Sequence, residues 1–130
     1  QGGPMRIAFE IIRITQRLDE VIDFNALIFR IDAPKRVDID SSRYLWIFLK
    51  TVIDGGVRKI IIDMKNLEMI DSSGMGVLIN AAKLVRGKKG DIILSNVSAD
   101  VRKIFKIINL QEFIKMFNTD GEAQNHFRFL

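Results

Sequence analysis

The sequence predicts an α/β fold: one mixed sheet of four to five strands covered by about four helices, in the order ββαβαβαβα. Three observations lead to this prediction. Two β-branched segments open the chain, strand-like and helix-like segments then alternate, and 48% of the 130 residues are apolar, enough to fill one core. Alternating strands and helices imply right-handed parallel crossovers, and an opening hairpin makes the sheet mixed.

Two strands are expected at the start of the chain. The first spans residues 6–15 and the second residues 21–31, and the polar residues 17–20 between them suit a hairpin turn. Pro34 then interrupts regular structure as far as Arg36, because proline lacks the backbone donor that a strand or helix uses.

A first helix is expected from a cap at Asp40 or Ser41 to about Ile53, where the glycines at 55–56 end it. Its apolar residues recur at helical spacing: Leu45, Phe48, Leu49, Val52 and Ile53. Trp46 and Ile47 extend this stripe almost all round the helix. Such a helix is either buried on two sides, under the opening hairpin or the tail, or presents a face to a second copy or a partner.

The middle of the chain contains a pair of serines at a predicted strand-to-helix transition. Residues 59–63 form a continuous β-branched run, typical of a strand covered on both faces, and a helix is expected from the serines to about residue 87. Ser72 and Ser73 therefore lie where backbone N–H groups lack helical partners and the helix dipole is positive. A hydroxyl there can cap the helix, and a phosphate on it would meet a favourable field.

The last third of the chain continues the alternation. A strand is expected at 91–95, a third helix after Ser98, a strand at 113–117 and a short helix capped by Thr119 or Asp120. The third helix places its apolar residues on one face: Val101, Ile104, Phe105 and Ile108. Without repeats or linkers, one domain is expected over residues 5–130, with residues 1–4 resembling a cloning remnant.

Composition excludes several classes of protein. The chain has no cysteine, which removes disulfides and thiolate chemistry and fits a reducing, cytoplasmic compartment. Its longest apolar run, residues 44–49, is too short to insert in a membrane, and no signal peptide opens the sequence. The net charge of +4 is modest, and no stacking aromatics interleave with the basic residues, so nucleic-acid binding is not expected.

The residues do not assemble into a recognisable catalytic motif. His126 is the lone histidine, and the glycines at 74 and 76 lack the lysine of a phosphate-binding loop. The carboxylates of Asp63, Glu68 and Asp71 surround the serines, where turn chemistry is more common than metal binding. We therefore expect no enzyme, no cofactor and no metal site.

Residues 60–78, which read IIIDMKNLEMIDSSGMGVL, resemble the signature of STAS domains, and among them the bacterial anti-sigma factor antagonists. The resemblance extends over about residues 21–127 with the same order of elements. Residues 89–98 resemble the family's next strand, and residues 101–110 resemble its third helix. Met75 stands where leucine is more usual in this signature.

The resemblance implies a set of site residues. The family's phosphoacceptor directly follows the motif aspartate, which here makes it Ser72, with Ser73 a lesser acceptor. A second aspartate near the serine is expected after the second strand; Asp38 is the best match, and Asp32 competes because residues 34–36 look like a short insertion. The implied phosphosite and partner-binding surface comprises Asp38, Asp71, Ser73, Gly74, Met75 and Gly76.

The resemblance also implies a protein-binding switch. An unphosphorylated antagonist binds an anti-sigma factor serine kinase, the kinase uses ATP and magnesium to phosphorylate the serine and end the complex, and a phosphatase resets it. The chain itself would need no cofactor. The alternative is a STAS scaffold without a serine kinase, such as a stressosome-like or lipid-trafficking component. The oligomeric state stays open at this point.

Overall fold

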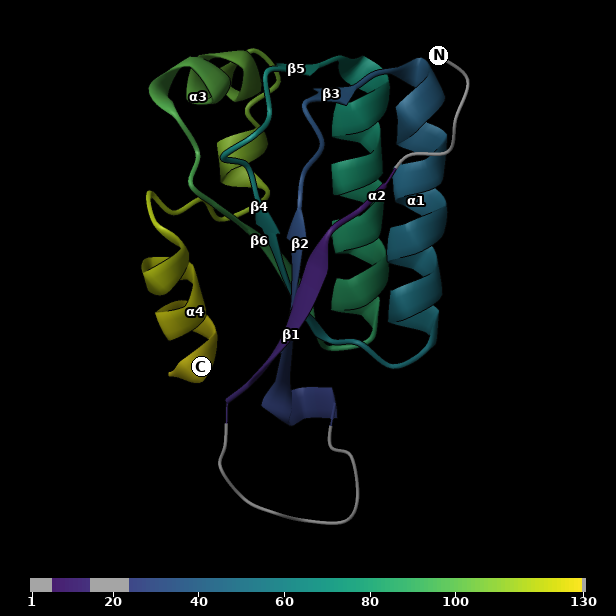
Figure 1. Cartoon of the computed structure of the whole chain (residues 1–130), viewed down its shortest axis with the longest axis vertical. Helices are drawn as coiled ribbons and strands as arrows, with labels where there is room; N and C mark the ends of the chain where they lie inside the picture. The colour runs from purple at the N-terminus through teal and green to yellow at the C-terminus, as the bar shows by residue number, and fades with distance from the viewer. Residues whose placement is uncertain (1–5, 15–23, 130) are drawn as a thin grey trace.

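The computed structural model describes residues 6–14 and 24–129. Its main sheet has four strands in the spatial order β1-β2-β4-β6 (Figure 1). Strand β1 pairs antiparallel with β2, whereas β2, β4 and β6 are parallel. The bounds of the strands are Phe9–Arg13 for β1, Leu27–Asp32 for β2, Lys59–Asp63 for β4 and Asp91–Ser95 for β6. The mixed α/β sheet expected from the sequence is confirmed.

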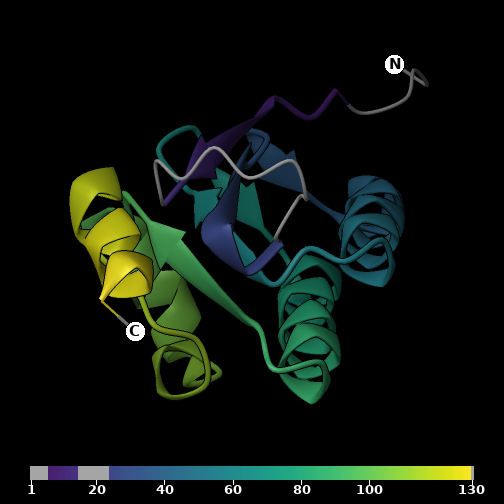
Figure 2. The same ribbon diagram turned by 90° about the horizontal axis from the view of Figure 1, so that it is seen from below.

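Within the described ranges, four helices cover the two faces of this sheet (Figures 1 and 2). Helices α1 (Ile39–Asp54) and α2 (Ser72–Gly87) lie side by side on one face, and α3 (Ala99–Lys106) joins the same core. Helix α4 (Asp120–Arg128) lies on the opposite face. Two short 3-10 turns also occur among the described residues, at Phe24–Ala26 (η1) and Leu110–Glu112 (η2).

Isoleucine-rich strands make a core on both faces of the sheet, because successive strand residues point to opposite sides. One set faces the larger core under α1, α2 and α3: Phe29, Ile31, Ile60, Ile62, Ile92 and Leu94. The other set packs against Ala123 and Phe127 of α4: Ile28, Ile61 and Ile93. Both faces of β4 are thus buried, as its continuous β-branched run predicts.

Several expected boundaries were wrong. Strand β1 begins at Phe9 and β2 at Leu27, both later than expected, while the turn expected at 17–20 lies outside the described residues. Residues 113–117 do not form a strand but make one bridge, from Met116 to Leu94. The N–H groups of Phe113 and Ile114 instead donate to the Leu110 carbonyl at 2.9 Å each, so the start of this segment continues the preceding turn η2.

The apolar first helix is covered on one side only. Leu45, Leu49 and Ile53 are fully buried, and Phe48 packs against the rings of Phe9 and Phe29, each 6.0 Å away. The opening hairpin therefore covers this helix, and the C-terminal segment does not, since Phe127 packs on the opposite face. The outward side chains of Tyr44 and Ile47 stay exposed, at 45% and 54%.

A half-buried arginine, Arg30, connects three strands and α4. Arg30 of β2 forms ion pairs with Asp63 of β4, Asp32 at 3.0 Å, Asp120 of α4 at 3.0 Å and Glu10 of β1 at 3.7 Å. The Asp63 side chain is fully buried and also accepts a hydrogen bond from Asn96 at 3.0 Å. A buried charge without its partner is strongly destabilising, so this pair is important to the packing of the sheet.

We predict that Arg30→Met lowers the free energy of unfolding by about 3–5 kcal/mol, because it leaves the buried Asp63 carboxylate with only the exposed Lys65 ammonium, 3.8 Å away, as a cation. The double variant Arg30→Met/Asp63→Leu should recover much of this loss. Lys50→Met, which breaks the exposed pair with Asp54 at 2.6 Å, is the matched control and should change stability little. Urea denaturation measures all three, and equal effects of Arg30→Met and Lys50→Met would refute the assignment.

Candidate functional site

Two short strands that the sequence did not predict organise the site. Strands β3 (Arg36–Val37) and β5 (Met69–Ile70) form a separate parallel pair, with Arg36 beside Met69 and Val37 beside Ile70. The Asp71 N–H continues the pairing by donating to the Val37 carbonyl at 3.1 Å. Since β3 leads directly into α1 and β5 into α2, the pair brings the N-termini of both helices together, at the top of Figure 1.

Each of these helices is capped by an aspartate. Asp71 Oδ1 accepts from the backbone N–H groups of Ser73 at 3.0 Å and Gly74 at 3.1 Å. Asp38 Oδ1 accepts from those of Asp40 at 3.1 Å and Ser41 at 3.0 Å. The expected caps, Ser72 or Ser73 for α2 and Asp40 or Ser41 for α1, were therefore wrong.

Charge and chain geometry explain the choice of cap. A carboxylate at the N-cap both accepts the free N–H groups and opposes the positive end of the helix dipole. Asp38 directly follows β3 and Asp71 directly follows β5, so the extended backbone that a cap needs falls at the aspartates. Ser41 instead completes a capping box, its Oγ accepting from the Asp38 N–H at 2.9 Å.

The two serines of the motif differ in availability. Ser73 is half-buried, and its hydroxyl donates to Asp71 Oδ1 at 2.5 Å. Ser72 is the first residue of α2 and is exposed, and among the described residues no group forms a hydrogen bond with its hydroxyl. The geometry thus leaves the Ser72 Oγ open to a reagent or partner and holds the Ser73 Oγ against a carboxylate.

Both capping carboxylates are held in the ionised form. The hydrogen bond from the Ser73 hydroxyl, followed by the one from the Gly74 N–H, lowers the pKa of Asp71 below its ordinary value. The Asp38 charge opposes this shift, which shows that the two carboxylates are electrostatic neighbours. The backbone hydrogen bond from Ser41 is the main cause that lowers the pKa of Asp38. Ser72 therefore begins α2 beside two fixed negative charges.

The glycines and the methionine of the motif have different surroundings. A Cβ on Gly74 would lie 2.6 Å from Val37 Cγ1, 2.7 Å from Ile70 Cγ1 and 2.9 Å from the Val37 carbonyl oxygen. Gly74 therefore permits the close approach of α2 to the β3-β5 pair. Met75 is 8% exposed and belongs to the core, whereas a Cβ on Gly76 would meet nothing within 4 Å. Of these three expected partner-binding residues, Gly74 and Met75 lie beneath the surface.

The remaining candidate residues lie away from the serines. Asp32 ends β2 and pairs with Arg30, so Asp38 and not Asp32 lies next to the start of α2. Asp63 belongs to the same arginine network and does not join Asp71. His126 packs between the rings of Phe117 and Phe127, at 5.3 and 5.6 Å. Within the described ranges, no cluster of acidic and histidine side chains is arranged to hold a metal ion.

Sequence reasoning missed one exposed residue at this site. Ile39 is the first residue of α1, the position that Ser72 occupies in α2, and it is 72% exposed. Because Val37 pairs with Ile70, Ile39 and Ser72 each follow a paired strand residue by two positions, and they begin neighbouring helices. Recognising Asp38 as the cap would have revealed the position, because the residue after an N-cap begins the helix.

Comparison with known proteins gives the family. The STAS domain family model matches residues 12–123, and the chain belongs to this family. The chain is 26% identical over 96 residues to a Thermotoga maritima protein provisionally named an anti-sigma factor antagonist, covering 72% of this chain and 84% of that protein. It is 31% identical over 65 residues to the anti-sigma-B factor antagonist of Listeria monocytogenes, covering 50% of this chain and 57% of that protein.

A solved structure supports the same assignment. The anti-sigma factor antagonist SpoIIAA, a Bacillus protein, superposes in its unphosphorylated form with a TM-score of 0.71 at 25% identity, covering 95% of this chain and 98% of that one. Its phosphorylated form superposes with a TM-score of 0.62 and covers 92% of this chain and 98% of that one. None of the helices among the described residues is long and apolar enough to cross a bilayer.

We predict that Gly74→Ala lowers the free energy of unfolding by about 1–3 kcal/mol, because the added methyl overlaps Val37 and Ile70. Gly76→Ala, two residues further along the same helix, should instead stabilise the chain by up to about 1 kcal/mol. Urea denaturation of the two variants measures the contrast. If both substitutions stabilise the fold equally, α2 does not approach the β3-β5 pair as closely as described.

The capping carboxylates also predict a pH dependence. Because folding lowers the pKa of Asp71, its charged cap contributes fully above the ordinary value of 3.8 and loses that contribution as pH falls through the lower folded value. Asp71→Asn keeps an acceptor but has no charge, so it should be less stable than the parent chain at neutral pH. The difference should shrink below pH 3.8 in urea denaturation at a series of pH values. A difference that stays constant to the lowest accessible pH would contradict the assignment.

Proposed function

We propose that this chain is an anti-sigma factor antagonist that works as a phosphorylation-controlled binding switch. In the unphosphorylated form it binds an anti-sigma factor serine kinase, and phosphorylation of Ser72 releases it. The observation that carries the proposal is the exposed Ser72 hydroxyl, without a hydrogen-bond partner among the described residues, next to a Ser73 hydroxyl already engaged by Asp71. The names of the relatives and the existence of a phosphorylated SpoIIAA support it.

The hydrogen bonds of this turn support an effect of the phosphate on a partner and not on the fold. The N–H groups of Ser73 and Gly74 already donate to Asp71, so a phosphate on Ser72 would find few free donors in the first turn of α2. It would add about −1.5 to −2 charges beside two carboxylates that are already ionised. Burying that charge in an interface costs several kcal/mol unless the partner pairs it, and about 1.4 kcal/mol is already tenfold in affinity.

The chemistry belongs to the partners in this proposal. The kinase transfers the γ-phosphoryl group of its magnesium-bound ATP to Ser72 Oγ, which loses its proton, and ADP leaves. A phosphatase hydrolyses the phosphoserine and restores the binding form. The chain is then a binding protein without a catalytic residue or cofactor of its own, and it acts in the cytoplasm with these partners. The carboxylates of Asp38 and Asp71 cap the two helices and make the surface around the acceptor negative.

Replacement of Ser72 tests the acceptor. Ser72→Ala should abolish phosphorylation by the cognate kinase and retain binding. It should change the free energy of unfolding by less than about 0.5 kcal/mol, since Asp71 and not Ser72 caps the helix. Ser73→Ala is the matched control and should leave phosphorylation at Ser72 detectable by mass spectrometry. Phosphate found on Ser73 or on a distant residue in the parent chain would show that the acceptor is wrong.

A second variant tests the role of charge. Ser72→Asp should weaken binding to the kinase in calorimetry, although one charge imitates a phosphate incompletely. Ser72→Asn adds a similar side chain without charge and should bind more tightly than Ser72→Asp. Equal affinities of the two variants and the parent chain would favour a STAS scaffold that binds its partner without a serine switch.

A further inference from the structure

We propose that two copies of this chain associate through the outer edge of β1, so that their two sheets join into one continuous sheet. The proposal concerns a surface apart from the Ser72 site and does not depend on the function proposed above. It rests on the direction of the β1 backbone, on its exposed side chains and on an apolar hollow beside it.

Strand β1 is the edge of the sheet, and among the described residues no strand pairs with its outer side. In an antiparallel ladder, alternate residues direct both backbone groups toward the neighbouring strand. Ala8 and Ile14 do so here, since the Ala8 carbonyl accepts from the Asp32 N–H at 2.9 Å and the Ile14 N–H donates to the Ala26 carbonyl at 2.8 Å. Phe9 and Ile11 therefore direct their N–H and C=O groups outward, ready for another strand.

The side chains of the same two residues are unusually exposed for their size. Phe9 is 54% exposed although its ring stacks on Phe29 at 5.0 Å, and Ile11 is 55% exposed. Both lie on the α1 side of the sheet, where Phe48 of α1 continues the apolar surface, with its ring 6.0 Å from that of Phe9. A long exposed edge that is also apolar invites pairing with another chain unless it is covered.

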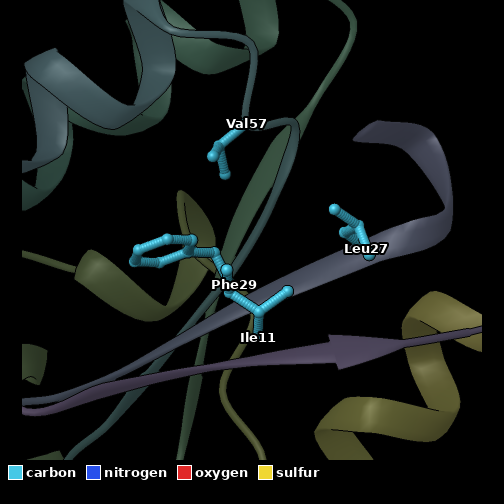
Figure 3. A pocket seen from close by; sticks show the side chains of 4 residues that line it. All are labelled: Ile11, Leu27, Phe29 and Val57. Carbon is cyan, nitrogen blue, oxygen red and sulfur yellow. The ribbon is translucent and has the colours of Figure 1, made fainter. Parts of the chain in front are cut away.

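An apolar hollow lies beside this strand, lined by Ile11, Leu27, Phe29 and Val57 (Figure 3). Leu27 pairs with Arg13, so the hollow extends along β1 two residues beyond Ile11, whereas the Phe9 ring lies two residues before Ile11. The half-exposed Phe9 ring and the Leu27 end of the hollow thus lie two residues on either side of Ile11 along one strand.

This spacing selects a second copy as the occupant. Two β1 strands can pair antiparallel about a two-fold axis at Ile11, so that Ile11 of one copy faces Ile11 of the other. Phe9 of each copy then faces Arg13 of the other copy. Because Arg13 pairs with Leu27, the Phe9 ring lies next to the Leu27 end of the other copy's hollow. Each copy then offers the same ring and the same hollow, as a two-fold interface requires. Glu10 faces Ile12, so like charges do not oppose each other. A shift that paired Phe9 with Ile11 would set Glu10 against Glu10, which is unfavourable.

Sedimentation equilibrium on the full chain tests the association. The parent chain should show a species of twice its 14.9 kDa mass that grows with concentration. Ile11→Lys places two lysines together on the axis and should weaken the association at least tenfold. Ile47→Lys is the matched control, because Ile47 is 54% exposed on the outward side of α1 and takes no part in the strand pairing. A monomer at all concentrations, or equal weakening by both variants, would overturn the proposal.

Cysteine cross-linking tests the register, and the chain has no native cysteine to interfere. In the proposed pairing the two Ile11 Cα atoms are about 5.5 Å apart, within the range that a disulfide spans. Under mild oxidation Ile11→Cys should give a covalent dimer, whereas Ile47→Cys should not. Circular dichroism shows whether each variant is folded. If Ile47→Cys cross-links as fully as Ile11→Cys, the contact is random or uses another surface, and the proposal fails.

Discussion

The pairing of β3 with β5 is the constraint on which the site depends. Two residues on each strand fix the start of α1 beside the start of α2, and the missing side chain of Gly74 allows α2 to approach that pair. The aspartate that follows each strand then becomes an N-cap. A short piece of parallel sheet thereby converts two distant sequence segments into one surface, with two fixed negative charges and a serine at its edge.

The same constraint separates the roles of the two serines. Helix α2 begins at Ser72, and the Ser72 hydroxyl is exposed in its first turn. The hydroxyl of the next residue, Ser73, donates a hydrogen bond to Asp71. One carboxylate satisfies two backbone N–H groups and one hydroxyl, which leaves little in this turn to neutralise an added phosphate. A phosphate added to Ser72, as we propose, would therefore remain at the surface with its charge largely uncompensated by this turn.

The sequence predicted the elements with strong periodicity and missed those without it. The isoleucine runs that became β4 and β6, and the helix after the serines, were placed within a residue or two because burial on both faces or on one stripe leaves a clear pattern. Strands β3 and β5 have two residues each, too few for any period, and were missed. The strand expected at 113–117 is reduced to one bridge because the N–H groups of Phe113 and Ile114 donate to Leu110 in the preceding turn, which alternation alone does not reveal. The caps of α1 and α2 were misassigned by one to three residues, since both Asp and Ser suit that position, whereas the cap predicted at Thr119 is confirmed.

The central claim is that charge at Ser72, and not modification of this turn in general, controls partner binding. The most direct measurement is the affinity of the kinase partner for two stoichiometrically modified chains, one with phosphoserine at 72 and one with phosphoserine at 73, against the unmodified chain. We expect phosphoserine at 72 to weaken binding at least tenfold without changing the fold. Phosphoserine at 73 should instead destabilise the N-terminus of α2, because the modified side chain can no longer donate its hydrogen bond to Asp71. Equal affinity of the unmodified chain and the chain phosphorylated at 72 would contradict it.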